Sequence, residues 1–405
     1  MKCRFCNHEV THEFLDLLNA PPSNSYLTLE KLNEPETFYP LKVLVCGHCF
    51  LVQVDEYQKS NELFNADYPY FSSMSSSWLE HAKNYVEMIT HQQNLHQHSQ
   101  VIEIASNDGY LLQFFKSKNI PCLGVEPTKS TADVARSKGI DVIEDFFGER
   151  LAGHLPKADL ILGNNVLAHV PNINDFVKGL KIVLKQKGII TMEFPHLLNL
   201  IEKNQFDTIY HEHFSYLSLM TTMNIFKAHG LQVYDVEELS THGGSLRIYA
   251  THIENTVSAT QQLATVLEKE MSANLHKIEG YNGFQIKANN IKYDFLNFLL
   301  KAKSENKKVI GYGAAAKGNT LLNYCGIKND LIDFVVDKAP LKIGKYLPGS
   351  HIPIVTEERV RELKPDFVVI FPWNIKEEIF NQLEYIKEWN GKFLVAIPYI
   401  EIMNG

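Results

Sequence analysis

The segment at residues 206–219, FDTIYHEHFSYLSL, gathers several side chains that can handle protons. Tyr210, His211, Glu212 and His213 follow one another without a break. A histidine titrates near neutral pH, so this run could supply a general base. His211 and His213 could also chelate a metal, because an extended strand would put both side chains on one face, although no third ligand is local. The residues alone leave both chemistries open, and we expect His211 to be structural.

Four of the six cysteines form two C-x-x-C pairs near the start of the chain. In a reducing compartment this spacing favours one tetrahedral Zn²⁺ over two disulfides, since each pair presents two thiolates from one tight turn. Four thiolates leave no open coordination position, so we expect a structural zinc site. Unmetallated or redox-active thiols are the alternative, because the loop of about 40 residues between the pairs is longer than usual. The expected ligands are Cys3, Cys6, Cys46 and Cys49.

Length and composition describe a soluble globular protein with more than one domain. The chain has 405 residues, of which 45% are hydrophobic and 21% are charged. This length predicts two or three domains, and the formal net charge of -8 argues against nucleic acid as a partner. We expect no membrane partner and a cytoplasmic location, because the N-terminus lacks a signal pattern and no apolar run approaches roughly 18–20 residues.

From residue 101 onward, short apolar segments alternate with amphipathic ones and predict an α/β fold. VIEIA, CLGVEP, IDVIE, DLILGNN and GIITMEFP are typical of a parallel sheet that is covered on both faces. LQVYDVEEL and GSLRIYATH would add an antiparallel pair that ends near residue 252. Residues 255–305 should be helical, and KKVIGYG begins a smaller second series. The predicted domains are a zinc-binding module at 1–65, an α/β domain at 66–252, and a helical linker plus a Rossmann-like domain at 253–405.

The residues that follow each predicted strand indicate the ligand, because open parallel sheets bind ligands at the carboxyl ends of their strands. The first loop has one glycine where a dinucleotide fingerprint needs three, and it offers acids and amides instead. An acid ends the second strand, where a ribose diol could be held. This pattern predicts S-adenosylmethionine, whose sulfonium and amine are cationic; turn and cap roles are the alternative for any single residue. The candidate contacts are Glu103, Ser106, Asn107, Asp108, Gly109, Glu126, Asp145, Phe146, Asn164 and Asn165, with Tyr70 from the preceding connector.

A glycine-rich loop follows the first strand of the C-terminal series. Its sequence, GYGAAAKGNT, opens a helix whose amides, with the Lys317 ammonium, could hold a phosphate or diphosphate. Asn319 and Thr320 are further candidate contacts. Asp337 would be the ribose-binding acid if the ligand were NAD, but the glycine spacing departs from the dinucleotide fingerprint. We favour a nucleotide-sugar diphosphate.

Several motifs together resemble one family, the sugar C-methyltransferases of nucleotide-linked keto sugars, which includes the kijanose and mycarose C3-methyltransferases. Besides the four cysteines, the motifs are EIASNDGYLL, GVEPT, NNVLAHVPN, YHEHFSYLS, HGGSLR and GYGAAAKGNTLLN, spread over essentially the whole chain. The resemblance implies a zinc module, a class I S-adenosylmethionine methyltransferase domain and a Rossmann-like nucleotide-sugar-binding domain. The first loop reads Ala-Ser-Asn-Asp-Gly, a mild departure that should leave cofactor binding intact.

The reaction that this family implies is methylation of carbon 3 beside a 4-ketone. The ketone lets the neighbouring carbon become an enolate, so the enzyme needs a base near that C–H and donors for the enolate oxygen. By resemblance the base is His213, with Tyr210 and Glu212 beside it and His169 completing the cluster. Our hypothesis is that His169 donates to the keto or enolate oxygen.

The resemblance also implies contacts to the sugar from the HGGSLR motif. A simple turn before the last strand is the alternative for its first residues. The expected substrate is a nucleotide-linked keto sugar, with dTDP as the first choice of nucleotide and GDP or CDP as alternatives. The candidate contacts are His242, Gly244, Ser245 and Arg247.

Two rival functions come from other classes. One is an NAD(P)-dependent nucleotide-sugar oxidoreductase or epimerase fused to a methyltransferase-like domain. The other is a non-catalytic nucleotide-sugar-binding protein. The run of titratable groups at 210–213 argues against the second, because a binding module has no need of it.

Overall fold

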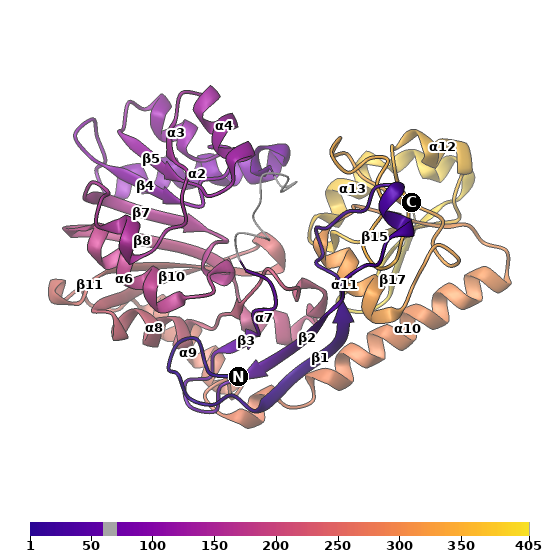
Figure 1. Ribbon diagram of the computed structural model, residues 1–405, viewed down its shortest axis with the longest axis horizontal. Helices are drawn as coiled ribbons and strands as arrows, with labels where there is room; N and C mark the ends of the chain where they lie inside the picture. Colours follow the sequence, from indigo (N-terminus) through magenta and orange to yellow (C-terminus); the bar gives the residue numbers. More distant parts are fainter. Residues whose placement is uncertain (60–70, 405) are drawn as a thin grey trace. The chain divides into compact units, whose positions relative to one another are not determined.

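The computed structural model describes residues 1–59 and 71–404 (Figure 1). Tyr70, one of the predicted cofactor contacts, lies outside the described residues. The chain forms two compact units, each assembled from three separate segments. The predicted domains 1–65, 66–252 and 253–405 are contiguous stretches of sequence and do not correspond to these units. Whether each of them folds independently stays a prediction. The first unit contains Met1–Thr11, Cys46–His196 and Phe214–Gly280, and the second contains His12–Val45, Leu197–His213 and Tyr281–Gly405.

A seven-stranded sheet forms the core of the first unit (Figure 1). Its order is β10-β11-β8-β7-β4-β5-β6, and its strands run parallel except β11, which is antiparallel to both neighbours. The parallel series predicted from residue 101 and the antiparallel pair near residue 252 are confirmed. The strands are β4 (Val101–Ile104), β5 (Cys122–Val125), β6 (Asp141–Ile143), β7 (Ala158–Asn164), β8 (Leu184–Pro195), β10 (Leu231–Leu239) and β11 (Ser245–His252). In the same unit, β3 (Val52–Val54) pairs with β9 (Ser215–Tyr216).

Helix α2 (Ser76–Gln92) shows why the local sequence of this unit folds as it does. The Ser75 side chain accepts a hydrogen bond from the Trp78 amide at 3.2 Å, which caps the helix. Buried residues recur at helical spacing and share one core cluster with strand residues Val101 and Leu160. These are Trp78, Ala82, Tyr85, Val86 and Ile89. The other helices of the unit are α3 (Leu112–Ser117), α4 (Lys129–Ser137), α5 (Glu149–Ala152), α6 (Ile173–Val183), α8 (Leu219–Ala228) and α9 (Gln261–Ser272).

A six-stranded sheet forms the core of the second unit. Its order is β14-β13-β12-β15-β16-β17, parallel except for β17, so the second alternating series is also confirmed. The strands are β12 (Val309–Tyr312), β13 (Val335–Val336), β14 (Ile354–Val355), β15 (Phe367–Ile370), β16 (Lys392–Val395) and β17 (Glu401–Asn404), and an antiparallel pair, β1 (His12–Ala20) with β2 (Tyr39–Val45), belongs to the same unit. The helices are α7 (Leu197–Glu202), α10 (Phe284–Ser304), α11 (Ala316–Cys325), α12 (Glu358–Leu363) and α13 (Lys376–Gln382). None of the helices in the described part of the chain combines the length and hydropathy that a membrane span requires.

Two glycines of the β12–α11 loop are required by close packing. Gly313 has a φ of +86, and a Cβ at this position would lie 2.4 Å from Pro372 Cγ. A Cβ on Gly318, in the first turn of α11, would lie 2.8 Å from Phe371 Cγ. The glycine-rich sequence therefore lets the loop and α11 approach the residues that follow β15.

A buried acid of helix α9 holds the start of helix α8 in the first unit. Glu270 Oε1 accepts from the Leu219 amide at 2.5 Å and from His196 Nε2 at 2.7 Å, and Oε2 accepts from the Met220 amide at 2.9 Å. Glu270 and His196 are both buried. The carboxylate satisfies amides that the helix leaves unpaired and complements the positive end of the helix dipole.

We expect Glu270→Ala to lower the free energy of unfolding by about 3 kcal/mol, because it leaves a buried histidine and two buried amides without an acceptor. Urea denaturation of the full chain, followed by circular dichroism, measures the change. Glu268→Ala is the matched control, since this exposed acid lies on the same helix. Equal loss of stability in both variants would contradict a capping role for Glu270.

Candidate active site

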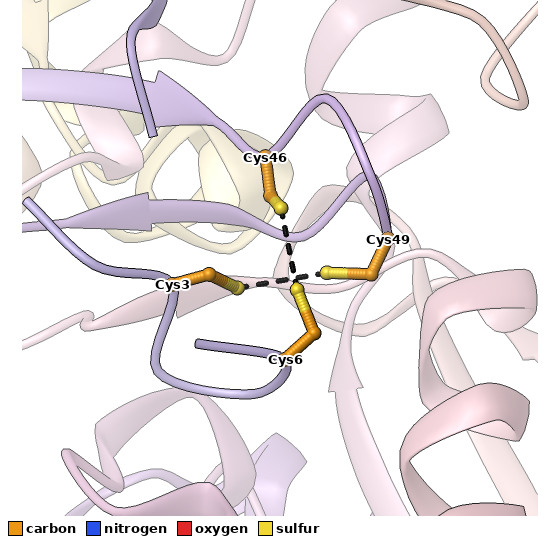
Figure 2. A group of neighbouring side chains, drawn as sticks. All are labelled: Cys3, Cys6, Cys46 and Cys49. Atoms are coloured by element: carbon orange, nitrogen blue, oxygen red, sulfur yellow. Dashed lines mark hydrogen bonds between the residues drawn. The ribbon is translucent and has the colours of Figure 1, made fainter. Parts of the chain in front are cut away.

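Four cysteine sulfurs converge in the first unit (Figure 2). The Sγ atoms of Cys3 and Cys49 lie 3.5 Å apart, as do those of Cys6 and Cys46, and all four lie within 4.8 Å of one another. Disulfide sulfurs would be about 2.05 Å apart, whereas four sulfurs around Zn²⁺ at about 2.3 Å come close to this spacing. Gln53 Nε2 donates to Cys3 Sγ at 3.3 Å, which suits a thiolate. The residues fit a closed, tetrahedral structural zinc site.

Three carboxylates gather at the ends of strands β4 and β5. Burial raises the pKa of Glu103 well above its ordinary value, and the negative charges of Asp108 and Glu126 add to this effect. Burial also raises the pKa of Glu126, although its hydrogen bonds with the amides of Thr128 and Asn107 oppose the shift. A cluster of like charges is costly unless cations offset it, and Lys138 Nζ, 3.6 Å from Asp108 Oδ2, offsets part of this cost. The cationic groups of S-adenosylmethionine fit this requirement.

The loop after β4 is fixed by the predicted contact residues themselves. Glu126 accepts from the amides of Asn107 and Thr128, both at 2.9 Å, and each carboxylate oxygen keeps a second lone pair. Asn107 Oδ1 accepts from the Ser72 amide at 2.9 Å, and Ser73 donates its hydroxyl to Asp108 Oδ2. These bonds give the acids and amides of the loop a defined shape.

Close packing explains why position 109 is a glycine. Its φ is +73, and a Cβ there would lie 2.4 Å from Ile140 Cδ1 and 3.1 Å from Ala135 Cβ. Ser106, the other small residue of the loop, is buried, and its Oγ would lie 2.3 Å from a Cβ on Gly124. The small residues let the loop pack against β5 and α4.

The predicted adenine contacts lie after β6. Asp145 Oδ2 accepts from Arg150 Nη2 at 2.6 Å, so its carboxylate is already paired at the surface. Phe146 is 41% exposed, whereas the next ring, Phe147, packs edge-on against Phe176. Phe146 thus offers an open aromatic face on which a base could stack.

The residues after β7 contact the HGGSLR motif. Asn165, at a φ of 56, donates from Nδ2 to His242 Nε2 at 2.7 Å, and Asn164 Nδ2 lies 3.4 Å from the Tyr110 hydroxyl. His242 also lies edge-on to the Trp78 ring. His169 is half-buried at the end of a 3₁₀ helix, Leu167–His169, that follows the same strand. The structure thus brings Asn165 and His242 together at the strand ends.

The rest of the motif is more buried than a set of direct sugar contacts would be. Ser245 is buried and donates to the Thr241 carbonyl at 3.0 Å. Gly244 has a φ of 127, so this position is strained for any residue with a side chain. Arg247 is 4% exposed, and its guanidinium donates to Glu193 at 3.0 Å and to Glu237 at 2.8 Å. These interactions make Arg247 a group that organises its surroundings.

Sequence reasoning missed two residues of this network, His81 and Glu193. The buried Glu193 accepts from His81 Nε2 at 2.8 Å, from Thr241 Oγ1 at 2.8 Å and from Arg247. Burial alone raises the pKa of Glu193, but the His81 hydrogen bond and the Arg247 charge outweigh it and lower that pKa. His81 stacks on Trp78 and is 20% exposed at its side chain. For Glu193, the one signal in the sequence was an acid inside the apolar strand ITMEFP. For His81, which lies on a helix, the sequence gave no signal.

In the second unit, the run at 210–213 forms a turn closed by a hydrogen bond from the His213 amide to the Tyr210 carbonyl at 3.0 Å. His213 Nδ1 donates to the Thr208 carbonyl at 2.8 Å. A carbonyl oxygen only accepts, so this bond places the proton on Nδ1 and leaves Nε2 as the proton acceptor. The Tyr210 ring lies 4.0 Å from the His213 ring, and Glu212, which is buried, accepts from Asn24 Nδ2 at 2.7 Å.

The turn removes the premise of a metal site at His211 and His213. The two residues do not sit on one face of an extended strand. His211 is buried, its Nε2 donates to the Pro40 carbonyl at 3.2 Å, and burial lowers its pKa. Among the described residues, the groups close enough to share a metal ion contain neither histidine. His211 is a neutral, structural side chain.

The start of helix α11 holds the predicted phosphate contacts. Lys317 Nζ donates to Asn374 Oδ1 at 2.6 Å and lies 4.4 Å above the Trp373 ring. Burial lowers the pKa of Lys317, and the charge of Asp207 opposes this. Asn319 and Thr320 are both buried: Asn319 donates to Ser23 O at 2.6 Å and Thr320 to Ile209 O at 2.8 Å. Lys317 is therefore the more accessible of the three predicted contacts.

Asp337, the acid that an NAD site would need, already has partners. Its oxygens accept from the amides of Ala314 at 2.7 Å and Ala339 at 2.8 Å. Lys342 Nζ lies 3.6 Å from the same carboxylate and donates to the Ala314 carbonyl at 2.8 Å. The acid shapes the β12–α11 loop, so it is poorly suited to hold a ribose.

We expect Cys46→Ser to reduce bound zinc from about one ion per chain to near zero and to lower the melting temperature, because metal binding by the four thiolates contributes directly to folding. Elemental analysis of the purified protein and a thermal melt measure both effects. Cys122→Ser is the control, since this half-buried thiol lies in β5 outside the cluster. Full zinc content in Cys46→Ser would contradict the assignment.

Family models match three successive parts of the chain. The model described as "Putative zinc binding domain" matches residues 3–64, and the cysteine cluster lies within that range. The model described as "Methyltransferase domain" matches residues 78–236, and the "C-methyltransferase C-terminal domain" model matches residues 240–398. These matches confirm the predicted order along the chain: a zinc-binding part, a methyltransferase part and a C-terminal part.

The chain is similar to two solved structures and to one relative in sequence, and only the relative in sequence bears on its family. Magnesium protoporphyrin IX methyltransferase from Synechocystis PCC 6803, solved with bound SAM, covers 43% of this chain and 79% of its own at 13% identity and a TM-score of 0.35. A S-adenosylmethionine-dependent methyltransferase from Clostridium acetobutylicum ATCC 824 covers 43% and 92% at 10% identity and a TM-score of 0.35. Both values are too low to bear on function. C-methyltransferase NovU from Streptomyces niveus is 32% identical over 408 residues, which span 100% of this chain and 97% of the relative. Identity at this level over the full length means that the chain belongs to the family of S-adenosylmethionine-dependent C-methyltransferases.

Proposed function

We propose that the enzyme methylates carbon 3 of a nucleotide-diphosphate-linked 4-keto deoxysugar through an enolate, with His213 as the base. The observation that carries this proposal is the hydrogen bond from His213 Nδ1 to Thr208 O. It places the ring proton on Nδ1, so Nε2 carries the lone pair that a base needs to accept a proton. The carbonyl also stabilises the imidazolium that forms when Nε2 takes the proton.

The neighbours of His213 suit the same role. The Tyr210 ring packs at 4.0 Å and limits the orientations of the imidazole. Glu212 is oriented by Asn24, and we assign it the role of holding a sugar hydroxyl. His169 is assigned the donor to the keto or enolate oxygen. Preorganised donors of this kind stabilise the charge that develops in the transition state.

The donor and acceptor sites differ in charge, as the two ligands require. In the first unit, Glu103, Asp108 and Glu126 favour the cationic S-adenosylmethionine, which supplies an electrophilic methyl group when bound. In the second unit, the α11 amides and the Lys317 ammonium favour a diphosphate. A dTDP-linked sugar is our first choice, and GDP or CDP are the other candidates.

The rival functions have less support. An NAD(P)-dependent oxidoreductase or epimerase would need a free ribose-binding acid after β13, and Asp337 is held by two backbone amides and Lys342. A non-catalytic binding protein is disfavoured because the chain belongs to a family of C-methyltransferases. A thermal-shift screen separates them: stabilisation by NAD(H) and not by nucleotide diphosphates would favour the oxidoreductase.

We expect His213→Asn to lower the rate of methyl transfer by roughly 10²–10⁴-fold, since asparagine cannot take a proton. Exchange of the carbon 3 proton with deuterated solvent should fall equally, because exchange needs the same base. His211→Asn is the control and should keep methyl transfer within about threefold, because its buried ring donates to Pro40 O and we assign it no part in the reaction. Full retention of transfer and exchange in His213→Asn would remove His213 from the role.

A mass-spectrometric assay with S-adenosylmethionine and a panel of dTDP-, GDP- and CDP-linked 4-keto sugars tests the substrate class. We expect one product that carries one additional methyl group. When the substrate carries deuterium at carbon 3, the product should have lost it. The matching 4-hydroxy sugars are the control, because without the ketone no enolate can form. Methylation of the 4-hydroxy sugars would contradict the enolate mechanism.

A further inference from the structure

Three consecutive residues, 207, 208 and 209, connect the proposed base to the proposed diphosphate site within the second unit. Thr208 supplies the carbonyl that fixes the tautomer of His213, at 2.8 Å. The carbonyl of Ile209 accepts from Thr320 Oγ1 on helix α11, also at 2.8 Å. Asp207 accepts from Trp373 Nε1 at 2.7 Å. The carbonyl that orients the base is thus flanked on both sides by bonds to the elements around Lys317.

Asp207 is the unusual member of this set. Its side chain is 1% exposed, and its Oδ1 has no hydrogen bond of good geometry within the described residues. Burial raises the pKa of Asp207 to about 6, against the opposing effects of the Lys317 charge and the Trp373 hydrogen bond. The carboxyl is therefore mainly ionised at neutral pH, and the indole N–H donates to a charged acceptor, which makes a stronger bond than a neutral one.

Trp373 carries the connection onward to the lysine. Its N–H is held by Asp207, while the face of its ring lies 4.4 Å from Lys317 Nζ. The next residue, Asn374, accepts from the same ammonium at 2.6 Å. Trp373 and Asn374 belong to the 3₁₀ helix Trp373–Ile375, which follows β15. One short segment thus touches both Asp207 and Lys317.

We infer that Asp207 is a positioning residue that fixes the distance between the His213 imidazole and the diphosphate-binding end of α11. The inference rests on the proposed function, in which one substrate molecule contacts both places. If the diphosphate is bound at Lys317, carbon 3 of the sugar lies at a fixed distance from Lys317. The His213 imidazole must therefore be held at the matching distance from Lys317. A displacement of about 1 Å can cost on the order of 10² in rate.

The substitutions separate the hydrogen bond from the charge. Asp207→Ala removes the acceptor, and Trp373→Phe removes the donor and keeps most of the ring. Asp207→Asn keeps an amide oxygen that can accept the indole N–H. We expect Asp207→Ala and Trp373→Phe each to lower both methyl transfer and carbon 3 proton exchange by about 10- to 100-fold. The rates of Asp207→Asn should stay within about threefold of wild type. The double variant Asp207→Ala/Trp373→Phe should be no slower than the slower of the two single variants, because both remove the same hydrogen bond.

The readouts distinguish positioning from general destabilisation. The rates are measured per folded active site, counted by titration with S-adenosylmethionine, and KM for S-adenosylmethionine should not change. Wild-type exchange in both Asp207→Ala and Trp373→Phe would overturn the inference while leaving the proposed function intact. Equal losses in Asp207→Asn and Asp207→Ala would also overturn it, because the charge and not the hydrogen bond would then matter. No proton exchange by the wild-type enzyme with any keto sugar would instead overturn the proposed function, and the inference with it.

Discussion

The hydrogen bond between His213 Nδ1 and the Thr208 carbonyl determines which nitrogen of the proposed base can accept a proton. Without it, the ring could carry its proton on either nitrogen. The turn at 210–213 brings the histidine back towards a carbonyl five residues earlier, so the bond depends on local chain geometry. That geometry is in turn held by helix α11 through Thr320 and by the residues after β15 through Asp207. The chemistry of one side chain thus depends on the packing of three elements of the second unit.

The buried acids of this protein fall into two kinds. Glu270 and Glu193 in the first unit, and Asp207 in the second, each accept hydrogen bonds from buried donors that would otherwise be unpaired. Glu103 differs, because its nearest charged neighbours are the carboxylates of Asp108 and Glu126. An arrangement of like charges costs stability in the absence of a cation. The cluster lies at the carboxyl ends of parallel strands, the edge at which open parallel sheets generally bind ligands, which agrees with the cofactor site that we propose.

Glycines and other small residues of both loops have structural duties that a motif does not reveal. Gly109 and Gly318 each leave room for a neighbouring element that a Cβ would displace. Thr320 and Asn319 are buried and tied to main-chain carbonyls, although both lie in a stretch typical of phosphate loops. Membership of a motif therefore does not by itself make a residue a ligand contact, because some of its residues are needed to shape the backbone.

The sequence by itself determined the class of the fold and the zinc site. Alternation of apolar strands with amphipathic helices fixes a parallel sheet, because both faces must be covered, and two C-x-x-C pairs suffice to specify four thiolates. It also placed Glu103, Asp108 and Glu126 at the strand ends. The tertiary structure was needed to show that the His213 ring carries its proton on Nδ1, that Arg247 is paired with Glu193 and Glu237, and that His81 and Asp207 belong to polar networks. These properties depend on contacts between residues up to 166 positions apart, such as Asp207 and Trp373, and no local pattern encodes such a pairing.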